Sequence, residues 1–358
     1  MAMIRHFGYG LSPMYVHQMI KTAILLEKKG FDMLRFGDHT LTLLGKDVEY
    51  AGAIAMVTAL GMKTKRAIVA IGVTDPYRRH PVSLAQDIAT IDRLTVGRAA
   101  LGLGAGEMMN LTPFGIKWEK PLTYLREATI VIKKLWEASS ETPVDFEGEV
   151  YTLRKAYLQI RPVQKPHPPI YIGALSPKTR ELAGELADGW YPACENPETF
   201  KRHRQDVEFG AKKAGRNIEE IDMVAIIPTA ISEDQEESYK AIEWGTRLNW
   251  LICGVKTLRE FGCDISVPSD LAIQRIVPSQ RVIEKLNEAL MMVPSEFVRS
   301  TAAFGTVDDC IQKIEEYLEA GATSIDLRNY GPDISRTVNM YSRRIIPYFK
   351  NKKEKTRW

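Results

Sequence analysis

Short apolar runs alternate along this chain with amphipathic stretches about a dozen residues long. This alternation predicts repeated strand–helix units around a parallel sheet, because the apolar runs have the length of buried strands and the longer stretches have helical spacing. The units recur across 358 residues. We therefore expect an α/β fold, a (β/α)8 TIM barrel with insertions, in which residues 1–358 form a single domain.

The order of the predicted elements contains two departures from simple alternation. Strands are expected at residues 4–9, 31–36, 67–73, 99–103, 169–172, 189–191 and 223–230, and helices at 15–29, 50–62, 81–94, 122–136, 178–187 and 197–214. The pattern of residues 144–158 predicts a β-hairpin extension, and that of residues 232–294 predicts a helical insertion within the barrel. A strand at 301–304, a helix at 307–320 and a strand at 324–327 are expected to close the barrel.

Net charge, the lack of targeting or membrane-spanning patterns, and cysteine spacing exclude several classes of function. The formal net charge is +3, with Lys and Arg interspersed among Asp and Glu, so we expect no nucleic-acid partner. There is no signal-peptide pattern and no apolar stretch of about 18 residues, so we expect a cytoplasmic protein without membrane contact. The four cysteines have neither CxxC spacing nor a neighbouring His cluster, which predicts mostly buried free thiols and no metal site.

The first candidate site residues follow the second and third predicted strands. Active sites of TIM barrels form at the carboxyl ends of the strands. His39 can donate or accept a proton there, and the adjacent Asp38 can set its tautomer or hold a ring, although such a pair is also common in ordinary loops. Gly72, before Val73, allows the backbone to approach a flat ring closely, and a simple turn is the alternative.

Two further strand ends suggest a cofactor. The run that contains Gly104 and Gly106 lacks the third glycine of a dinucleotide fingerprint and does not open directly into a helix, so a loop wrapped against a cofactor is favoured. Glu107 follows as a carboxyl acid or base. Ser176 can cap a helix with Pro177 at its first position, leaving N–H groups that bind phosphate readily. A capped helix without a ligand is the alternative.

Four segments, taken in this order, resemble the luciferase-like superfamily and specifically its branch that depends on coenzyme F420. They are residues 37–39, residues 76–81, residues 102–107 and residues 178–190. The resemblance covers nearly the whole chain. It implies a luciferase-like barrel, usually a homodimer, that acts on a small-molecule substrate by reversible hydride transfer at C5 of the deazaflavin.

The same resemblance implies the roles of individual residues. The non-prolyl cis peptide bond of the family would lie at Gly72–Val73, behind the deazaflavin. His39 and Glu107 would serve as the catalytic residues on the proton side of the reaction. The residues implied to bind the coenzyme are Asp38, Gly72, Val73, Gly104, Gly106, Asn110, Gly173 and Leu175, with Ala174, Ser176 and Pro177 at its phosphate.

Departures from the family pattern limit the prediction of the substrate. The alcohol and sugar-phosphate dehydrogenases of this branch have a Trp four residues after the active-site His and a Glu at the end of strand one, whereas this chain has Leu43 and Ser12-Pro13. Methylenetetrahydromethanopterin reductases also lack that Trp, so a methylene-tetrahydropterin or another carbonyl, imine or alkene acceptor stays open.

Two other functions are compatible with the same fold. One is an FMN-dependent monooxygenase, because the fold and the ring site are shared within the superfamily. The other is a non-catalytic flavin-binding relative. The presence of both His39 and Glu107 argues against this last alternative.

Overall fold

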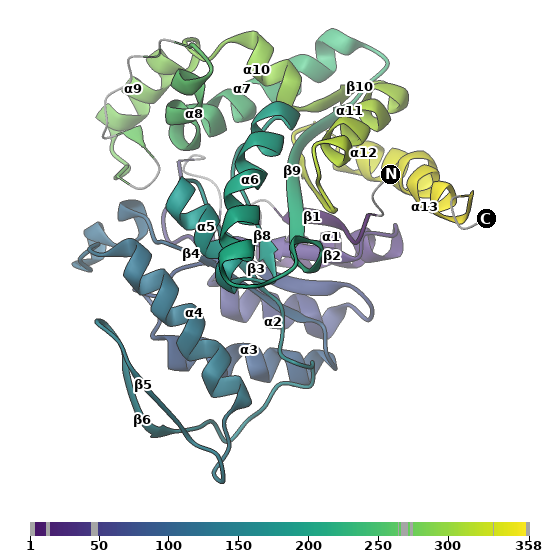
Figure 1. Ribbon diagram of the computed structural model, residues 1–358. Helices are drawn as coiled ribbons and strands as arrows, with labels where there is room; N and C mark the ends of the chain where they lie inside the picture. The colour runs from purple at the N-terminus through teal and green to yellow at the C-terminus, as the bar shows by residue number, and fades with distance from the viewer. Residues whose placement is uncertain are drawn as a thin grey trace.

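The computed structural model describes residues 4–11, 15–43, 49–263, 265, 271–272, 275–331 and 333–355. Within these ranges, eight parallel strands close into a barrel, because β9 pairs with both β8 and β11 (Figure 1). The predicted TIM barrel with insertions is confirmed. In ring order the strands are β1 (Phe7–Leu11), β2 (Met33–Phe36), β3 (Ile68–Thr74), β4 (Ala99–Gly104), β7 (Ile170–Gly173), β8 (Gly189–Trp190), β9 (Asp222–Ile231) and β11 (Ser324–Asn329).

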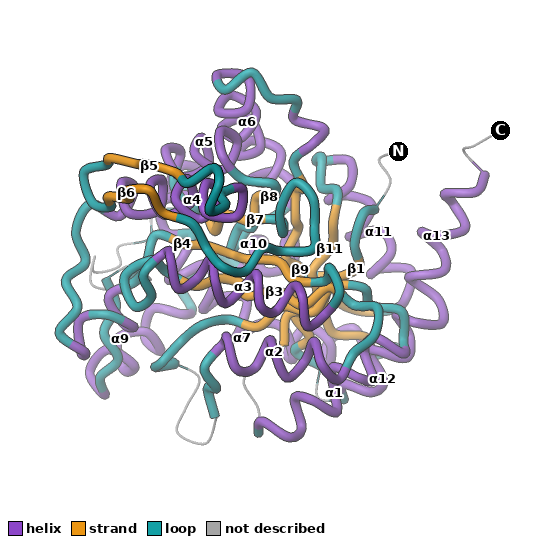
Figure 2. Tube along the Cα trace, turned by 90° about the horizontal axis from the view of Figure 1, so that it is seen from below, coloured by secondary structure: helices purple, strands orange, loops and turns teal. Residues whose placement is uncertain are grey.

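Helices that alternate with these strands form the outer layer, as the view from below shows (Figure 2). Each places an apolar stripe against the barrel; in α1, for example, Met19, Ala23 and Leu26 are fully buried at helical spacing. The helices of this layer are α1 (Val16–Lys28), α2 (Ala53–Lys63), α3 (Pro81–Thr95), α4 (Pro121–Glu137), α5 (Pro177–Leu186), α6 (Pro197–Lys213) and α11 (Val307–Glu319), and the chain continues into α12 (Ile334–Met340) and α13 (Ile346–Lys355).

A group of helices between β9 and β11 covers one end of the barrel, and we call it the roof (top of Figure 1). It has its own core, in which Trp250, Leu251 and Val293 are fully buried. The roof consists of α7 (Gln235–Cys253), α8 (Val255–Glu260), α9 (Gln280–Leu290) and α10 (Ser295–Thr301). Its helices α7, α8 and α9 lie within residues 232–294, where a helical insertion is predicted, and α10 lies beyond that segment.

The strand predicted at 301–304 does not close the ring, which corrects the prediction. Thr301 ends α10, where its hydroxyl accepts the Trp250 indole N–H at 2.8 Å. The strand observed is β10 (Ala303–Gly305), and it pairs only with the far end of β9. Because β9 has ten residues and β8 only two, β9 extends beyond the ring with a free edge, which β10 covers.

The predicted hairpin is present as β5 (Val144–Glu147) and β6 (Thr152–Ala156), an antiparallel pair at the bottom of Figure 1. The buried Glu127 of α4 holds its turn, because its carboxylate accepts three backbone N–H groups, those of Glu149, Val150 and Tyr151, at 2.7–3.0 Å. A single carboxylate thus fixes the hairpin to the outer layer.

Glycines allow α5 and α6 to pack in close contact. A Cβ at Gly184 would overlap the carbonyl oxygen of Val207, and a Cβ at Gly210 would overlap that of Glu181.

We expect Gly184→Ala to lower the free energy of unfolding by about 1–3 kcal/mol, because overpacking displaces the helix backbones. Urea unfolding followed by circular dichroism measures this loss.

Gly52→Ala is the control for this prediction, because a Cβ there meets nothing within 4 Å. Gly52 precedes α2 with φ of −62°, so only the preference of this N-terminal position is affected, at a cost under about 1 kcal/mol. Equal unfolding midpoints for Gly184→Ala and the wild type would show that the two helices tolerate a wider separation.

Candidate functional site

A cavity of about 760 Å³ opens at the carboxyl ends of the barrel strands, where the barrel meets α7 and α8 of the roof. This volume lies within the range of about 300–1,000 Å³ that is typical of ligand pockets. Residues at or just beyond the ends of β1, β2, β3, β4, β7, β8 and β11 line it. The cavity is therefore where TIM barrels place their active sites.

Val73 lies in a bulge of β3 that forms part of the cavity wall. The pairing of β3 with β4 shifts register at this point, and the Gly72–Val73 peptide bond is cis, as the family resemblance implied. Glycines on the two neighbouring strands accommodate the bulge. A Cβ at Gly104 would lie 2.9 Å from a Val73 methyl group, and one at Gly173 would lie 3.3 Å from both methyls. Val73 thus packs against glycines at the ends of both neighbouring strands.

The loop after β4 continues this surface. Gly106 has φ of +77°, in the left-handed region that favours glycine, and a Cβ there would lie 3.0 Å from the ring of Tyr77. The Trp118 indole N–H donates to the Ala105 carbonyl oxygen at 2.8 Å and fixes the loop. Trp118 itself lines the cavity.

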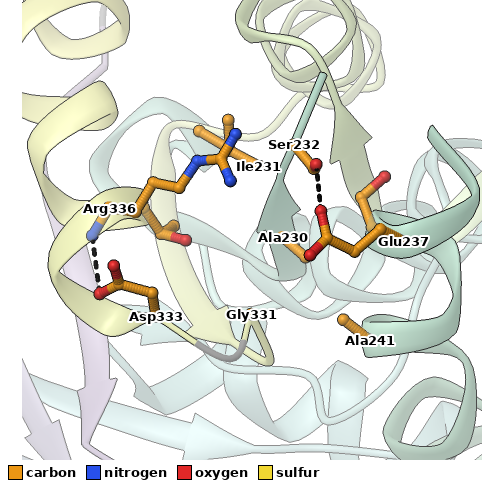
Figure 3. Close-up of a pocket in the computed structure, with 10 residues that line it drawn as sticks. Ala230, Ile231, Ser232, Glu237, Ala241, Gly331, Asp333 and Arg336 are labelled. Carbon is orange, nitrogen blue, oxygen red and sulfur yellow. Dashed lines mark hydrogen bonds between the residues drawn. The ribbon is translucent and has the colours of Figure 1, made fainter. Parts of the chain in front are cut away.

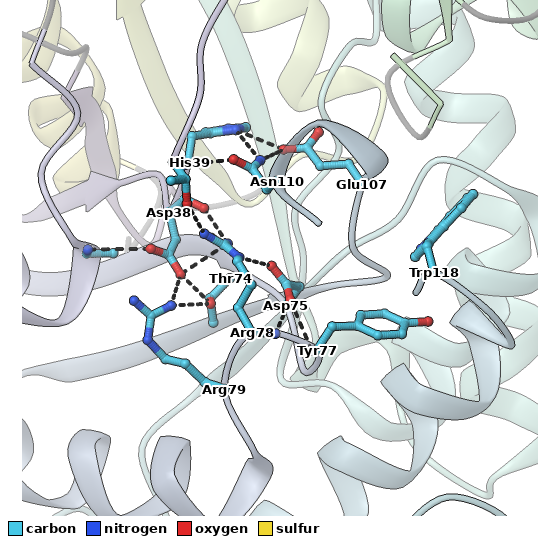
Figure 4. Close-up of polar contacts among 12 residues, drawn as sticks. Asp38, His39, Thr74, Asp75, Tyr77, Arg78, Arg79, Glu107, Asn110 and Trp118 are labelled. Atoms are coloured by element: carbon cyan, nitrogen blue, oxygen red, sulfur yellow. Dashed lines mark hydrogen bonds and ion pairs between the residues drawn. The ribbon is translucent and has the colours of Figure 1, made fainter. Parts of the chain in front are cut away.

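Asp38 connects the ends of β2 and β3 beside the cavity (Figure 4). Its Oδ2 accepts hydrogen bonds from Thr74 Oγ1 at 2.6 Å, from Arg78 Nη2 at 3.2 Å and from Arg79 Nη1. Its Oδ1 accepts the N–H of Ala53 at 3.4 Å. Asp38 is almost fully buried and both oxygens are engaged, so it orients the loop that carries His39 and does not set the tautomer of that ring.

His39 and Glu107, which are far apart in the sequence, meet in the cavity wall (Figure 4). His39 Nδ1 lies 2.8 Å from Glu107 Oε1. The amide nitrogen of Asn110 contacts the same two atoms, at 3.0 Å and 2.6 Å, while its oxygen accepts the N–H of Thr40 at 2.7 Å and of Leu41 at 3.2 Å. Because Nδ1 is engaged, Nε2 is the nitrogen left to exchange a proton with a ligand.

The amino end of α5 also faces the cavity. Ser176 and Thr179 form a capping box, in which Ser176 Oγ accepts the Thr179 N–H at 3.3 Å and Thr179 Oγ1 accepts the Ser176 N–H at 3.0 Å. Both residues and Lys178 line the cavity. Since the Ser176 side chain is already bonded within the cap, an anion here would be held by N–H groups of the first turn and by Lys178.

The predicted site residues gather in this one cavity with two exceptions. The side chain of Asn110 is buried behind His39 and supports it from outside the cavity wall. Pro177 occupies the first position of α5 and does not line the cavity.

Trp118, Tyr50 and Arg328 are among the residues of the described cavity wall that sequence reasoning did not identify. Arg328 directly follows the predicted strand at 324–327, so the strand-end criterion could have found it. Tyr50 was assigned to a predicted helix, but α2 begins only at Ala53. Burial raises the pKa of the Tyr50 hydroxyl, so this hydroxyl keeps its proton and can donate a hydrogen bond.

The roof side of the cavity is mainly apolar. Trp244, Leu248 and Ile252 of α7 line it together with Leu43, the residue at the position where some family members have Trp. Ser12 and Pro13, the other departure from the family pattern, lie outside the described residues.

Other sites in the described chain offer little for chemistry. A hollow of about 30 Å³ between the end of β9 and α12 has room for about one water molecule (Figure 3). No group of three His, Cys, Asp or Glu side chains in the described ranges is placed to hold a metal ion. Cys194 and Cys310 are buried and Cys253 and Cys263 are partly buried, all as free thiols. No described helix is long and apolar enough to span a membrane.

The sequence of this barrel matches a known family. The luciferase-like monooxygenase profile aligns with residues 1–324. The chain belongs to the luciferase-like monooxygenase family. A 5,10-methylenetetrahydromethanopterin reductase from Archaeoglobus fulgidus is 30% identical to this luciferase-like chain over 340 residues, which are 91% of this chain and 94% of the reductase.

Two solved structures resemble this luciferase-like barrel over almost their full length. An F420-dependent secondary alcohol dehydrogenase, in complex with an F420–acetone adduct, has a TM-score of 0.81 and 26% identity, covering 95% of this chain and 98% of that one. The F420-dependent tetrahydromethanopterin reductase from Methanopyrus kandleri has a TM-score of 0.81 and 25% identity, covering 97% and 100%. The predicted luciferase-like barrel is thus confirmed.

Proposed function

We propose that this luciferase-like protein is a coenzyme F420-dependent oxidoreductase that transfers a hydride reversibly between the deazaflavin and an organic acceptor. The observation that carries the proposal is the surface at the ends of β3, β4 and β7, where Gly104 and Gly173 accommodate the Val73 methyls beside the cis Gly72–Val73 bond. A flat ring fits such a surface, and side chains at these glycines would obstruct it. The similar dehydrogenase whose structure contains an F420–acetone adduct supports the choice of coenzyme.

The residues present fit F420 at both ends of the cavity. The ring would lie against Val73 and the loop that includes Gly104 and Gly106, and the phosphate would lie at the start of α5, close to Lys178. The residues proposed to contact the coenzyme are Asp38, Gly72, Val73, Gly104, Gly106, Gly173, Ala174, Leu175 and Ser176. Asn110 and Pro177, which do not line the cavity, would act indirectly through His39 and the helix cap.

His39 and Glu107 are proposed to manage the proton. Bound F420 supplies a two-electron hydride carrier that reacts poorly with oxygen. With Nδ1–H donated to Glu107, His39 can accept a proton at Nε2 from an alcohol or amine, and its imidazolium form can return one in the reverse direction. Glu107 stabilises the imidazolium, and the Asn110 amide nitrogen keeps Glu107 in place by donating to its Oε1.

The acceptor is proposed to be a methylene-tetrahydromethanopterin-type pterin or another carbonyl, imine or alkene compound. Leu43 in place of Trp disfavours the alcohol and sugar-phosphate substrates of related dehydrogenases. We propose that the chain is a single barrel domain in which residues 232–294 are an insertion that shapes the acceptor pocket, since Trp244, Leu248 and Ile252 line the cavity.

A parallel fluorescence titration with F420 and FMN tests the coenzyme. We expect a dissociation constant for F420 that is micromolar or lower, and FMN binding that is at least about 50-fold weaker. Oxidation of reduced F420 is then screened with pterin, ketone, imine and alkene acceptors. A preference for FMN, with oxygen consumption by the reduced flavin, would replace this proposal with a monooxygenase.

Two further properties belong to this proposal. The protein is proposed to be a homodimer, as family members usually are, and to function in the cytoplasm.

A further inference from the structure

Arg328 stands out as a partly buried cation that no described carboxylate contacts directly, although Asp326 acts on its charge from a longer distance. It lies near the end of β11, is partly buried and lines the cavity, but it makes no hydrogen bond or ion pair with a described residue. A charge removed from water without a partner is costly. In contrast, Arg35, deeper in the barrel, lies between the rings of Tyr171 and Tyr191 at 4.5 and 4.4 Å.

The groups around Arg328 place it at the reactive part of the cavity. Burial lowers the pKa of its guanidinium, but Tyr191, Tyr330 and Asp326 more than offset burial, so Arg328 stays protonated. Burial raises the pKa of Cys253, in the roof, to about 12, with Glu107 adding to this shift and Arg328 opposing it. The charges of Glu107 and Arg328 therefore both act on the Cys253 thiol of the roof.

The order of strands in the barrel separates Arg328 from the proposed ring site. The ring site lies on β3, β4 and β7, and β11 is opposite β4 in the closed ring. A ring bound against Gly104 would therefore turn its free face toward Arg328, which places this residue on the side of the acceptor.

A second donor faces the same space. The Tyr50 hydroxyl would lie 2.8 Å from a Cβ at Gly37, and it forms no hydrogen bond with a described residue. The Tyr50 ring packs edge-on against His39, with 5.2 Å between ring centroids, and its hydroxyl lies within electrostatic reach of Arg328. Tyr50 thus contacts the proposed proton-transfer residue and lies near Arg328.

We propose that Arg328 and the Tyr50 hydroxyl bind a carboxylate group of the acceptor. The inference rests on the proposed function and adds a substrate class to it: an acceptor with an apolar body against Leu248 and Ile252 and an anionic group at Arg328. A guanidinium presents two parallel N–H donors that match the two oxygens of a carboxylate. The reducible bond would then lie toward His39.

Benzoate and benzamide are the probes for this site, because they have nearly the same shape and differ in charge. Binding to the full-length protein is measured by tryptophan fluorescence and by the shift in melting temperature, without and with F420. We expect benzoate to bind at least about tenfold more tightly than benzamide. Arg328→Met should remove this difference, Arg328→Lys should retain part of it, and Tyr50→Phe should weaken benzoate about threefold or more.

Two matched variants separate this site from the coenzyme site. Lys178→Met, at the start of α5, should weaken F420 binding and leave benzoate binding unchanged, whereas Arg328→Met should do the opposite. Arg336→Met, at an exposed position, should change neither. If the wild type binds F420 but does not distinguish benzoate from benzamide, or if Arg328→Met binds benzoate as well as the wild type, the carboxylate site is refuted. If benzoate selectivity is present but F420 does not bind, the proposed function alone fails.

Discussion

His39→Ala should lower the turnover of reduced F420 by about 10²–10⁴-fold, the usual contribution of a general acid or base. Turnover is measured with the best acceptor from the screen of pterin, ketone, imine and alkene compounds. Because His39 is proposed to exchange a proton with the acceptor through Nε2, loss of the imidazole should lower the rate of turnover and leave coenzyme binding unchanged. The dissociation constant for F420 should stay within about threefold of the wild-type value.

Glu107→Gln separates positioning from charge at the same site. Glutamine can still accept a hydrogen bond from His39 Nδ1 but does not stabilise an imidazolium, so turnover should fall by a smaller factor, about tenfold or more. His17→Ala, at an exposed histidine of α1, is the control and should leave turnover unchanged. Full turnover by His39→Ala would refute the proposed proton role.

Gly104→Val should weaken F420 binding about 100-fold or more. A Cβ at this position would lie 2.9 Å from a Val73 methyl, so a valine would displace Val73 and distort the surface proposed for the ring. A 100-fold change corresponds to about 2.7 kcal/mol of lost binding free energy. The fluorescence titration measures it, and the melting temperature verifies that the variant is folded.

Gly10→Ala is the matched control in the opposite wall of the same cavity. A Cβ there would lie at ordinary contact distances of 3.6 Å or more, so F420 affinity should change less than about threefold. Tight F420 binding by a folded Gly104→Val protein would show that the ring does not lie on this surface, even though the fold assignment would stand.

Strand positions were largely predictable because the apolar runs of a parallel sheet are buried on both faces. The run at 223–230, for example, lies inside β9, which is buried along its whole length. Boundaries were less predictable where tertiary contacts decide them. The helix predicted from residue 50 begins at Ala53, where Asp38, a residue of another segment, accepts the first helical N–H. The first strand begins at Phe7 because its register is set by β2 and β11.

Candidate site residues could be predicted from the sequence because the carboxyl ends of all TIM-barrel strands lie at the same end of the barrel, where the active site forms. This rule predicted His39 and Glu107 as site residues, but it did not predict that their side chains are in contact. It assigned Asp38 a role at the His39 ring that the structure gives to Glu107 and Asn110. The same rule applies to Arg328, which directly follows the predicted strand at 324–327, but this residue was not among the predicted site residues.

The sequence by itself determined the alternation of strands and helices, and with it the barrel and the side on which its site lies, because these depend on local periodicity and on handedness of the strand–helix unit. Only the tertiary structure decided which polar groups are satisfied by one another and which are left facing the cavity. Asp38 is neutralised by arginines that follow β3, whereas Arg328 has no such partner among the described residues. Partnerships of this kind join residues tens of positions apart, and no local pattern encodes them.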